Sequence, residues 1–500
     1  MKLSKTKILF IVSNFFFIET HQEDLYYNDF PLGILQIISY LKKKANVKSY
    51  ICDLRVEGLE FPELGGNEPN YEKFEKSLLR VLKKCKIAKI RNVAISCYTS
   101  YHYMQTELIA KILRKQFPNI NIIVGGYHPT AVPDDFTYQG APYDYIIKGE
   151  SEDTLLQLIQ QNKLKNKGTK PKKIILEGKT FQNIDLLPLP DYELYLKKYS
   201  GKIIPKFELY ISRGCPYQCA FCGSNYDFRS FTFNNFIRKF DQFCRIVNKY
   251  SKASKPKISF ADQSFDKVSI YQEVLKYIYE NQLYRKYEFS CQCRVENLTL
   301  EQVRLLRNCN FIIGFGFESA SPRLLRLMDK THDPRDYIDK MIQKLQLYKN
   351  ESGIYCRLNI LCGFPGETLE DFMITVIFIK WFALHKNIQI SPTLFSNYPN
   401  IKVYKNLEDY RYNGSEFNEN WWHTEENYFK LSVPMMISEN YPLVSLLRDY
   451  IGQYSEIIKF FIKENLKTLF NNNPIGALSP IIMWEKFYKE WIQELESEKE

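Results

Sequence analysis

Short apolar runs alternate with longer amphipathic stretches twice along this chain, in residues 6–160 and again in residues 205–400. In the first region the apolar runs predict strands, and the stretches between them carry apolar residues at helical spacing. Strands that alternate with helices are typical of parallel α/β sheets. We therefore expect a doubly wound, Rossmann-like sheet here, with strands at 8–12, 47–52, 93–97, 120–124 and 145–147 and helices at 32–43, 71–84, 105–116 and 153–161.

The second region repeats the pattern with six apolar runs, at 208–212, 257–261, 287–291, 311–317, 355–362 and 388–394. Six strand–helix units are too few for a closed eight-stranded barrel. Between the two regions, a polar run at 163–173 and the extended backbone favoured by Pro188 and Pro190 predict a linker. We expect four parts: a first domain at 1–162, a linker at 163–204, a second domain at 205–400, and a mainly helical region at 401–500, with helices at 444–463 and 484–495 and an exposed aromatic cluster at Trp421 and Trp422.

Composition narrows the class of protein. The chain of 500 residues is 45% hydrophobic, enough for two to four folded domains. Its net charge of +11 is scattered rather than gathered into a basic stripe, so nucleic-acid binding is not favoured. The apolar run near the amino terminus lacks a small-residue cleavage site, and the run at 373–384 is too short to span a bilayer. We expect no membrane span.

Three of the twelve cysteines, Cys215, Cys219 and Cys222, have Cx3Cx2C spacing. Thiolates at such spacing suit zinc, copper(I) or an iron–sulfur cluster. Structural zinc and electron-transfer clusters normally take four protein ligands, and no fourth cysteine follows at ferredoxin spacing. Three thiolates would leave one iron of a cluster open to substrate; a zinc loop or chance spacing is the alternative. An oxygen-sensitive cluster also needs a reducing compartment, which indicates the cytoplasm.

The segment at 211–223 resembles the cluster loop of the radical S-adenosylmethionine (SAM) enzymes, whose motif carries an aromatic residue before the third cysteine, here Phe221. The resemblance implies a partial (β/α)6 barrel with a 4Fe–4S cluster on Cys215, Cys219 and Cys222. It also implies that residues at the carboxyl ends of the strands contact SAM. Either Arg357 or Asn359 would then face the SAM carboxylate. Simpler alternatives are a salt bridge for Glu318 and structural roles for Arg357 and Asn359. The implied SAM contacts are Phe221, Asp262, Glu318, Ser319, Arg357, Asn359, Gly363 and Gly366.

The first region resembles the cobalamin-binding domain found upstream of many radical SAM cores. It lacks the DxHxxG motif that supplies a histidine to cobalt, because Asp24 stands where the glycine should follow His21. The resemblance therefore implies cobalamin without a protein histidine ligand; a degenerate domain that binds nothing is the alternative. His128 could equally be an ordinary loop residue. The implied cobalamin contacts are Ser96, Thr99, Gly125, Gly126, His128, Gly149 and Glu150.

Together these resemblances imply a cobalamin-dependent radical SAM enzyme, with methylation of an unactivated carbon as the expected reaction. A 5′-deoxyadenosyl radical would take a hydrogen from the substrate, and methylcobalamin would donate the methyl group. An oxidative cyclase or rearrangement enzyme, a radical enzyme with an empty first domain, and a non-catalytic cluster and corrin sensor remain as alternatives. The expected partners are a small-molecule or peptide substrate and an electron donor such as flavodoxin or ferredoxin.

Overall fold

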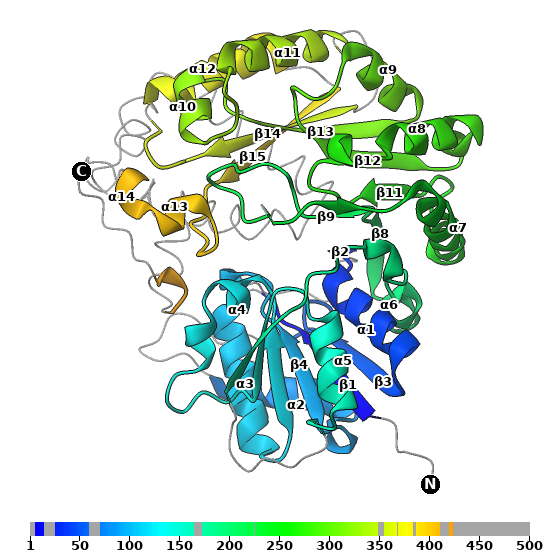
Figure 1. Cartoon of the computed structure of the whole chain (residues 1–500), viewed down its shortest axis with the longest axis vertical. Helices are drawn as coiled ribbons and strands as arrows, with labels where there is room; N and C mark the ends of the chain where they lie inside the picture. Colours follow the sequence, from blue (N-terminus) through cyan, green and yellow to red (C-terminus); the bar gives the residue numbers. More distant parts are fainter. Residues whose placement is uncertain are drawn as a thin grey trace, which may run out of the picture. The chain divides into compact units, whose positions relative to one another are not determined.

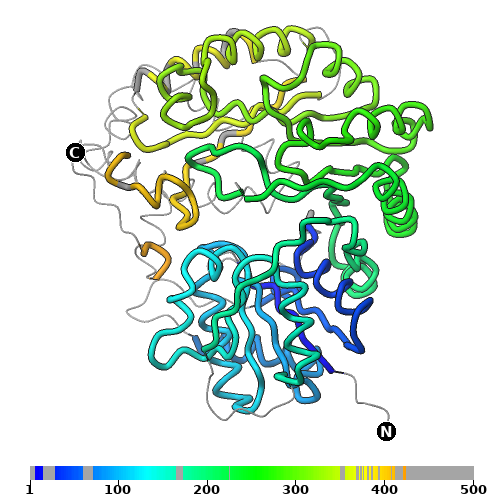
Figure 2. Tube along the Cα trace, viewed as in Figure 1, coloured from blue at the N-terminus to red at the C-terminus, as the bar shows by residue number. Residues whose placement is uncertain are grey.

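The computed structural model describes residues 6–14, 26–59, 71–164, 173–224, 226–348, 355–367, 369–383, 387–410 and 420–423. The chain forms two compact units (Figures 1 and 2). Phe30–Ile204 makes up most of the first unit and Pro205–Asn397 most of the second. The helices expected at 444–463 and 484–495 lie outside the described residues.

The first unit is built on a parallel sheet with strand order β3-β1-β4-β5-β6-β7. The order reverses between β1 and β4, so right-handed crossovers place helices on both faces. Helix α1 packs with α5, while α2 and α3 lie together and are joined by Glu75 and Gln116 (Figure 1). This confirms the doubly wound fold. The elements are β1 (Thr6–Val12), β3 (Val47–Asp53), β4 (Asn92–Ser96), β5 (Asn121–Gly125), β6 (Tyr145–Lys148), β7 (Ile174–Glu177), α1 (Leu32–Lys44), α2 (Tyr71–Lys84), α3 (Tyr103–Gln116), α4 (Tyr127–Ala131), α5 (Glu152–Gln160), α6 (Tyr192–Tyr199) and the short turns η1 (Ile87–Lys89), η2 (Ser100–His102), η3 (Pro133–Phe136) and η4 (Ile184–Leu186).

The described part of the range expected as a linker, 163–204, contains regular secondary structure. It supplies the edge strand β7 and the helix α6, and both belong to the first unit. Helix α6 begins with Asp191, whose carboxylate accepts a hydrogen bond from the Leu194 amide and caps the helix. Tyr195 and Tyr199 on this helix are fully buried and bond to the first unit, Tyr195 through the Asp53 carboxylate at 2.8 Å.

The second unit contains a sheet with strand order β15-β14-β13-β12-β11-β8-β2. Its six strands from β8 to β15 run parallel, in the order of the sequence, so right-handed crossovers put their helices on one face (Figure 1). This confirms the partial barrel. Strand β2 is an addition that the sequence did not predict. The elements are β2 (Tyr26–Asp29), β8 (Ile203–Leu209), β9 (Ser212–Arg213), β10 (Arg229–Ser230), β11 (Lys257–Phe260), β12 (Glu288–Cys293), β13 (Phe311–Glu318), β14 (Cys356–Cys362), β15 (Ile388–Leu394), α7 (Phe233–Tyr250), α8 (Tyr271–Glu280), α9 (Leu300–Asn308), α10 (Pro322–Leu327), α11 (Pro334–Gln346), α12 (Leu369–Phe378), α13 (Lys402–Lys405), α14 (Leu407–Tyr410) and the turns η5 (Phe265–Lys267), η6 (Leu283–Arg285), η7 (Ile379–Ala383) and η8 (Trp421–His423).

Stacked aromatic rings fill the space between α7 and the covered face of the second sheet. Phe240 stacks on Phe260 and Phe260 on Phe311, with interplanar angles of 12° in both pairs. All three rings are at most 1% exposed. The expectation that Trp421 and Trp422 are exposed is wrong, because both are fully buried and the Trp421 indole donates to the Asn397 carbonyl at 3.0 Å.

Candidate functional site

The three predicted cluster cysteines lie in a loop closed by the two-stranded hairpin of β9 and β10. Gly214 opens the loop with a φ of +78°, and a Cβ there would collide with the backbone oxygens of Tyr226 and Asp227. The Cys215 amide donates to the Tyr226 carbonyl at 3.2 Å. Glycine is therefore required at this position, and the loop leaves β8 at the edge where the carboxyl ends of the parallel strands meet.

Arg294, which follows β12, holds this loop from the side. Its Nη1 lies 3.2 Å from Sγ of Cys219, and its guanidinium lies 3.9 Å from the ring centre of Tyr217. The arginine is itself fixed by an ion pair with Glu296 at 2.5 Å and by a hydrogen bond to the Lys330 carbonyl. A positive charge thus faces a thiol that would ligate the cluster. Arg294 is not among the site residues predicted from the sequence.

The loop fits a cluster better than a single metal ion. Sulfurs bound to one tetrahedral zinc lie about 3.8 Å apart, yet the three loop cysteines are not among the described groups whose ligand atoms all fall within 4.8 Å. They form no disulfide, and burial raises the pKa of the Cys215 and Cys222 thiols. A bound metal would supply the positive charge that keeps such thiols deprotonated. The donor set and its spacing therefore suit an iron–sulfur cluster.

Among the described residues, one group of three possible metal ligands does have its ligand atoms within 4.8 Å of one another. It lies in the first unit and consists of Cys52, Glu57 and Cys85. Lys198 already provides the positive charge there. Its Nζ lies 2.8 Å from the Glu57 carboxylate, 3.4 Å from Sγ of Cys85 and 2.9 Å from the Ile51 carbonyl. This group therefore forms an ion-pair network in which an exposed lysine compensates the carboxylate and the thiols.

A buried ion pair lies beside the cluster loop. Lys330 Nζ and Glu318 Oε1 are 3.0 Å apart, and Lys330 lies 5.8 Å from the ring centre of Phe221. Glu318 has a φ of +70°, a strained conformation for a residue with a side chain. Its carboxylate comes within 2.9 Å of where a Cβ on Gly316 would lie, so glycine leaves the room that the pair occupies. An ammonium and a carboxylate side by side suit the carboxylate and amino groups of an amino acid.

Asp262 and Ser319 support the site from within the protein. The Asp262 carboxylate accepts hydrogen bonds from the Ile211 amide at 3.1 Å and from the Ser212 hydroxyl. Burial raises the pKa of Asp262 to about 7. The Ser319 hydroxyl lies 2.9 Å from that of Thr375, and Ser319 is 1% exposed. Asp262 therefore anchors the start of the hairpin, and Ser319 joins β13 to α12.

The loop after β14 turns on two glycines. Gly363 has a φ of +75° and Gly366 one of +80°. The Glu367 carboxylate reaches back to the Gly363 amide at 2.5 Å, and burial raises the pKa of Glu367 to about 8. The turn therefore presents backbone at the carboxyl edge, where a flat ring could approach closely.

Arg357 and Asn359 lie on the sheet face that the helices do not cover. Asn359 donates to the Gln292 amide oxygen at 3.0 Å, and Arg357 donates to that of Gln389 at 3.2 Å. Both side chains are partly exposed. Within the described residues, no hydrogen bond joins either side chain to the Glu318–Lys330 pair.

In the first unit, the predicted loops meet at the carboxyl ends of β4, β5 and β6. Gly126 has a φ of +125°, and a Cβ there would collide with the Cys97 carbonyl. The Tyr127 amide donates to the Tyr98 carbonyl at 3.2 Å, and the Gly149 amide donates to the Thr130 hydroxyl at 2.9 Å. Ser96 ends β4 beside Gly125 in register. Tyr98 is 58% exposed, so the edge offers an aromatic side chain and bare backbone, as a large planar ligand needs.

Three other predicted cobalamin residues carry internal bonds. The two ring nitrogens of His128 face the Ser100 hydroxyl at 2.9 Å and the Asp135 carboxylate at 3.1 Å, and His128 is 1% exposed. The Thr99 hydroxyl lies 3.0 Å from Nδ1 of His102. The Glu150 carboxylate accepts from the Phe181 amide at 2.9 Å. These contacts favour the loop-stabilising alternative for His128.

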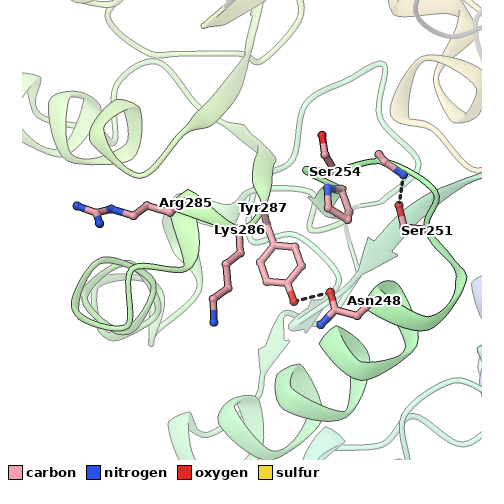
Figure 3. Close-up of a pocket in the computed structure, with 8 residues that line it drawn as sticks. Asn248, Ser251, Ser254, Arg285, Lys286 and Tyr287 are labelled. Atoms are coloured by element: carbon pink, nitrogen blue, oxygen red, sulfur yellow. Dashed lines mark hydrogen bonds between the residues drawn. The ribbon is translucent and has the colours of Figure 1, made fainter.

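A hollow lined by Asn248, Lys286 and Tyr287 lies at the opposite edge of the second sheet, before the amino ends of β11 and β12 (Figure 3). There the Tyr287 hydroxyl donates to the Asn248 side chain at 2.9 Å. Since this edge is remote from the cysteine loop, the hollow is not part of the candidate site. In the part of the chain that the structure describes, no helix combines the length and apolar character needed to cross a membrane.

Comparison with known proteins agrees with this geometry. Residues 209–379 match the family model of the radical SAM superfamily, and residues 25–159 match that of the B12 binding domain. The chain is 27% identical to an uncharacterised methyltransferase of Pyrococcus horikoshii over 70% of this chain and 73% of that protein. It is 23% identical to a bacteriochlorophyllide d C-8(2)-methyltransferase of Chlorobaculum tepidum over 73% of this chain and 77% of that protein. Its fold is similar to that of a radical SAM methyltransferase, TsrM, from Kitasatospora setae, whose structure was solved with cobalamin and a 4Fe–4S cluster. The TM-score is 0.57 at 12% sequence identity, and the match covers 82% of this chain and 76% of that protein.

Proposed function

Because this chain belongs to the radical SAM enzymes that carry a B12 binding domain, we propose that it is a cobalamin-dependent methyltransferase acting on an unactivated carbon. The observation that carries the proposal is the presence on one chain of a three-cysteine loop with the Glu318–Lys330 pair beside it and of a glycine-lined edge in a second sheet. A radical site alone explains hydrogen abstraction, and a corrin alone transfers methyl groups to nucleophiles. The two together account for methylation of a carbon that is not a nucleophile.

When bound, the cluster supplies an electron to SAM and cobalamin carries the methyl group. Cys215, Cys219 and Cys222 would hold the cluster, and Arg294 would fix the loop through Cys219. The Lys330 ammonium suits the SAM carboxylate, and the Glu318 carboxylate suits an ammonium or ribose hydroxyl. Backbone at Gly363 and Gly366 would approach the adenine.

In the first unit, Gly125 and Gly126 would let the corrin side chains approach the backbone. His128 is already bonded through both ring nitrogens. Cobalamin bound without a histidine on cobalt is therefore the expected form. The cluster needs a reducing compartment and an electron donor, for which the cytoplasm and a flavodoxin or ferredoxin are the simplest choices.

The test uses SAM with a deuterated methyl group and the anaerobically reconstituted full chain. In the first step, cobalamin is reduced without substrate, and deuterated methylcobalamin and S-adenosylhomocysteine are expected. In the second, a metabolite extract is added, and a deuteromethylated product is expected together with deoxyadenosine. Deoxyadenosine formed only with extract, while neither S-adenosylhomocysteine nor deuteromethyl product appears, would reject methylation in favour of cyclisation or rearrangement.

A further inference from the structure

We infer that Arg357, on the uncovered face of the second sheet, binds an anionic group of the substrate, either a carboxylate or a phosphate. The inference rests on the proposed function and narrows its substrate class. It begins with the alternation along β14. Cys356, Leu358 and Ile360 are at most 2% exposed and pack beneath the helices. Arg357 and Asn359 alternate with them, so they point to the inner face of the partial barrel.

The charge of Arg357 has no counter-ion within the described residues. Within those residues the guanidinium donates to the neutral amide oxygen of Gln389, 3.2 Å away, and no carboxylate among them forms an ion pair with it. Burial lowers the pKa of the guanidinium. The two cations near the cysteine loop are both paired, Lys330 with Glu318 and Arg294 with Glu296. A half-buried charge without a counter-ion costs stability, and binding of an anion is the way to recover it.

The surroundings of Arg357 suit an oxyanion. In register beside Arg357 and Asn359 on β13 are Gly314 and Gly316. These positions carry no side chain, and the space over Gly314 is taken by the Gln292 amide, which accepts from Asn359 at 3.0 Å. The inner face near Arg357 is thus lined by neutral amides that can donate hydrogen bonds and by bare backbone.

Depth in the sheet distinguishes the substrate from SAM as the source of the anion. Arg357 is five residues before Cys362, the last residue of β14, and therefore about 16 Å from the carboxyl edge. The cysteine loop and Lys330 lie at that edge, where a SAM carboxylate at the open iron would be. Arg357 would then bind a group of the substrate well away from the reacting carbon, which predicts an elongated acidic substrate.

The test measures anion binding to the purified, cluster-loaded full chain by its thermal unfolding midpoint at fixed ionic strength. The probes are inorganic phosphate and succinate, with succinamide as the neutral counterpart of succinate. The variants are Arg357→Gln and Arg357→Lys, and the matched control is Arg304→Gln, an exposed arginine on α9. We expect at least one anion to raise the midpoint of wild type and Arg304→Gln but not of Arg357→Gln, with Arg357→Lys intermediate and succinamide without effect. Without anions, Arg357→Gln should melt above wild type, because it removes an uncompensated charge.

Equal protection of wild type and Arg357→Gln, or no protection of any chain by either anion, would overturn the inference. The affinity for SAM is measured in parallel by equilibrium dialysis, and Arg357→Gln should leave it within twofold of wild type. A loss of tenfold or more would assign Arg357 to the SAM carboxylate instead. If Arg357→Gln fails to fold, Arg357→Lys decides by weaker anion protection at unchanged SAM affinity. None of these readouts requires turnover, so failed methylation with anion protection intact would reject only the proposed reaction.

Discussion

The sheet of the first unit is covered by helices on both faces, whereas the sheet of the second unit is covered on one. Strand β1 shows this in its burial, because Ile8–Val12 are five consecutive buried residues. Strand β12 instead alternates, with Phe289, Cys291 and Cys293 buried and the residues between them partly exposed. The first sheet can therefore offer a ligand only its loops, while the second can offer both loops and an inner face.

This difference explains why the candidate site is built from backbone in one unit and from side chains in the other. In the first unit the features of the candidate site are backbone features, such as the positive φ of Gly126. In the second they are side chains on strands or directly after them, such as Arg357 and Arg294. Substitutions should therefore act through loop shape in one unit and through charge in the other.

The largest effect is expected from Cys219→Ala. Removing one thiolate should abolish cluster binding and deoxyadenosine formation, since the loop supplies three cysteine ligands and the variant keeps only two of them. Iron and sulfide analysis after anaerobic reconstitution measures this, and cobalamin bound by the first unit should stay at the wild-type level. Cys309→Ala, a buried cysteine at the end of α9, is the matched control and should retain iron. Full iron content in Cys219→Ala would contradict the assignment.

Gly126→Ala should have the next largest effect, confined to the first unit. A side chain here meets the Cys97 carbonyl and must adopt a φ of +125°, which costs about 1–3 kcal/mol. Cobalamin stoichiometry should fall while iron content is unchanged. Gly33→Ala is the control, because nothing lies within 4 Å of a Cβ there, and it should bind cobalamin normally. Equal cobalamin binding by Gly126→Ala and Gly33→Ala would exclude this loop from the site.

A third effect is expected from Arg294→Gln. Residues that bond to metal ligands typically contribute 10–100-fold to metal affinity or activity, and we expect a loss in about this range. The reduction potential of the cluster should also fall, because a positive charge near Cys219 is removed. Arg294→Lys keeps the charge but loses the stacking on Tyr217, so it should keep most of the potential with weaker iron retention. A potential unchanged in both variants would show that Arg294 only packs the loop.

Much of the fold could be predicted from the sequence because strands buried on a sheet face leave apolar runs. Helix α2 occurs at the predicted residues, and the cysteine loop was recognised by its Cx3Cx2C spacing together with Phe221 before the third cysteine. Strand β2, with the sequence Tyr-Tyr-Asn-Asp, was missed because a four-residue polar strand leaves no apolar run. Helix α6 differs from the predicted linker, because the extended backbone that Pro188 and Pro190 favour ends just before the helix begins at Tyr192.

The site was less predictable than the fold, for a physical reason. Lys330 follows α10 in a polar stretch that looks like any solvated turn, and only the fold brings it to Glu318. Arg294 stands two residues from Glu296, and its contact with Cys219 spans 75 positions of the chain. Such long-range pairs leave no local signal. The positive φ of Glu318 leaves none either, because no turn residue marks it.

The smallest effect is a difference in pH dependence between the units. Burial and the charge of Arg55 lower the pKa of His102 to about 3, while burial raises the pKa of Glu367 to about 8. The unfolded values are about 6.5 and 4.3. The folded first unit binds fewer protons at His102 than the unfolded chain does, so this contribution is present above pH 6.5 and is lost as the pH falls towards 3. The folded second unit binds more protons at Glu367, so that contribution is complete below about pH 4.3 and is lost as the pH rises towards 8.

The measurement is hydrogen exchange of β5 in His102→Asn and of β14 in Glu367→Gln, each compared with wild type. The difference in unfolding free energy between variant and wild type should change with pH in opposite directions in the two units, by at most about 1.4 kcal/mol per pH unit. Parallel slopes in the two units would mean that burial of these two groups does not set their protonation.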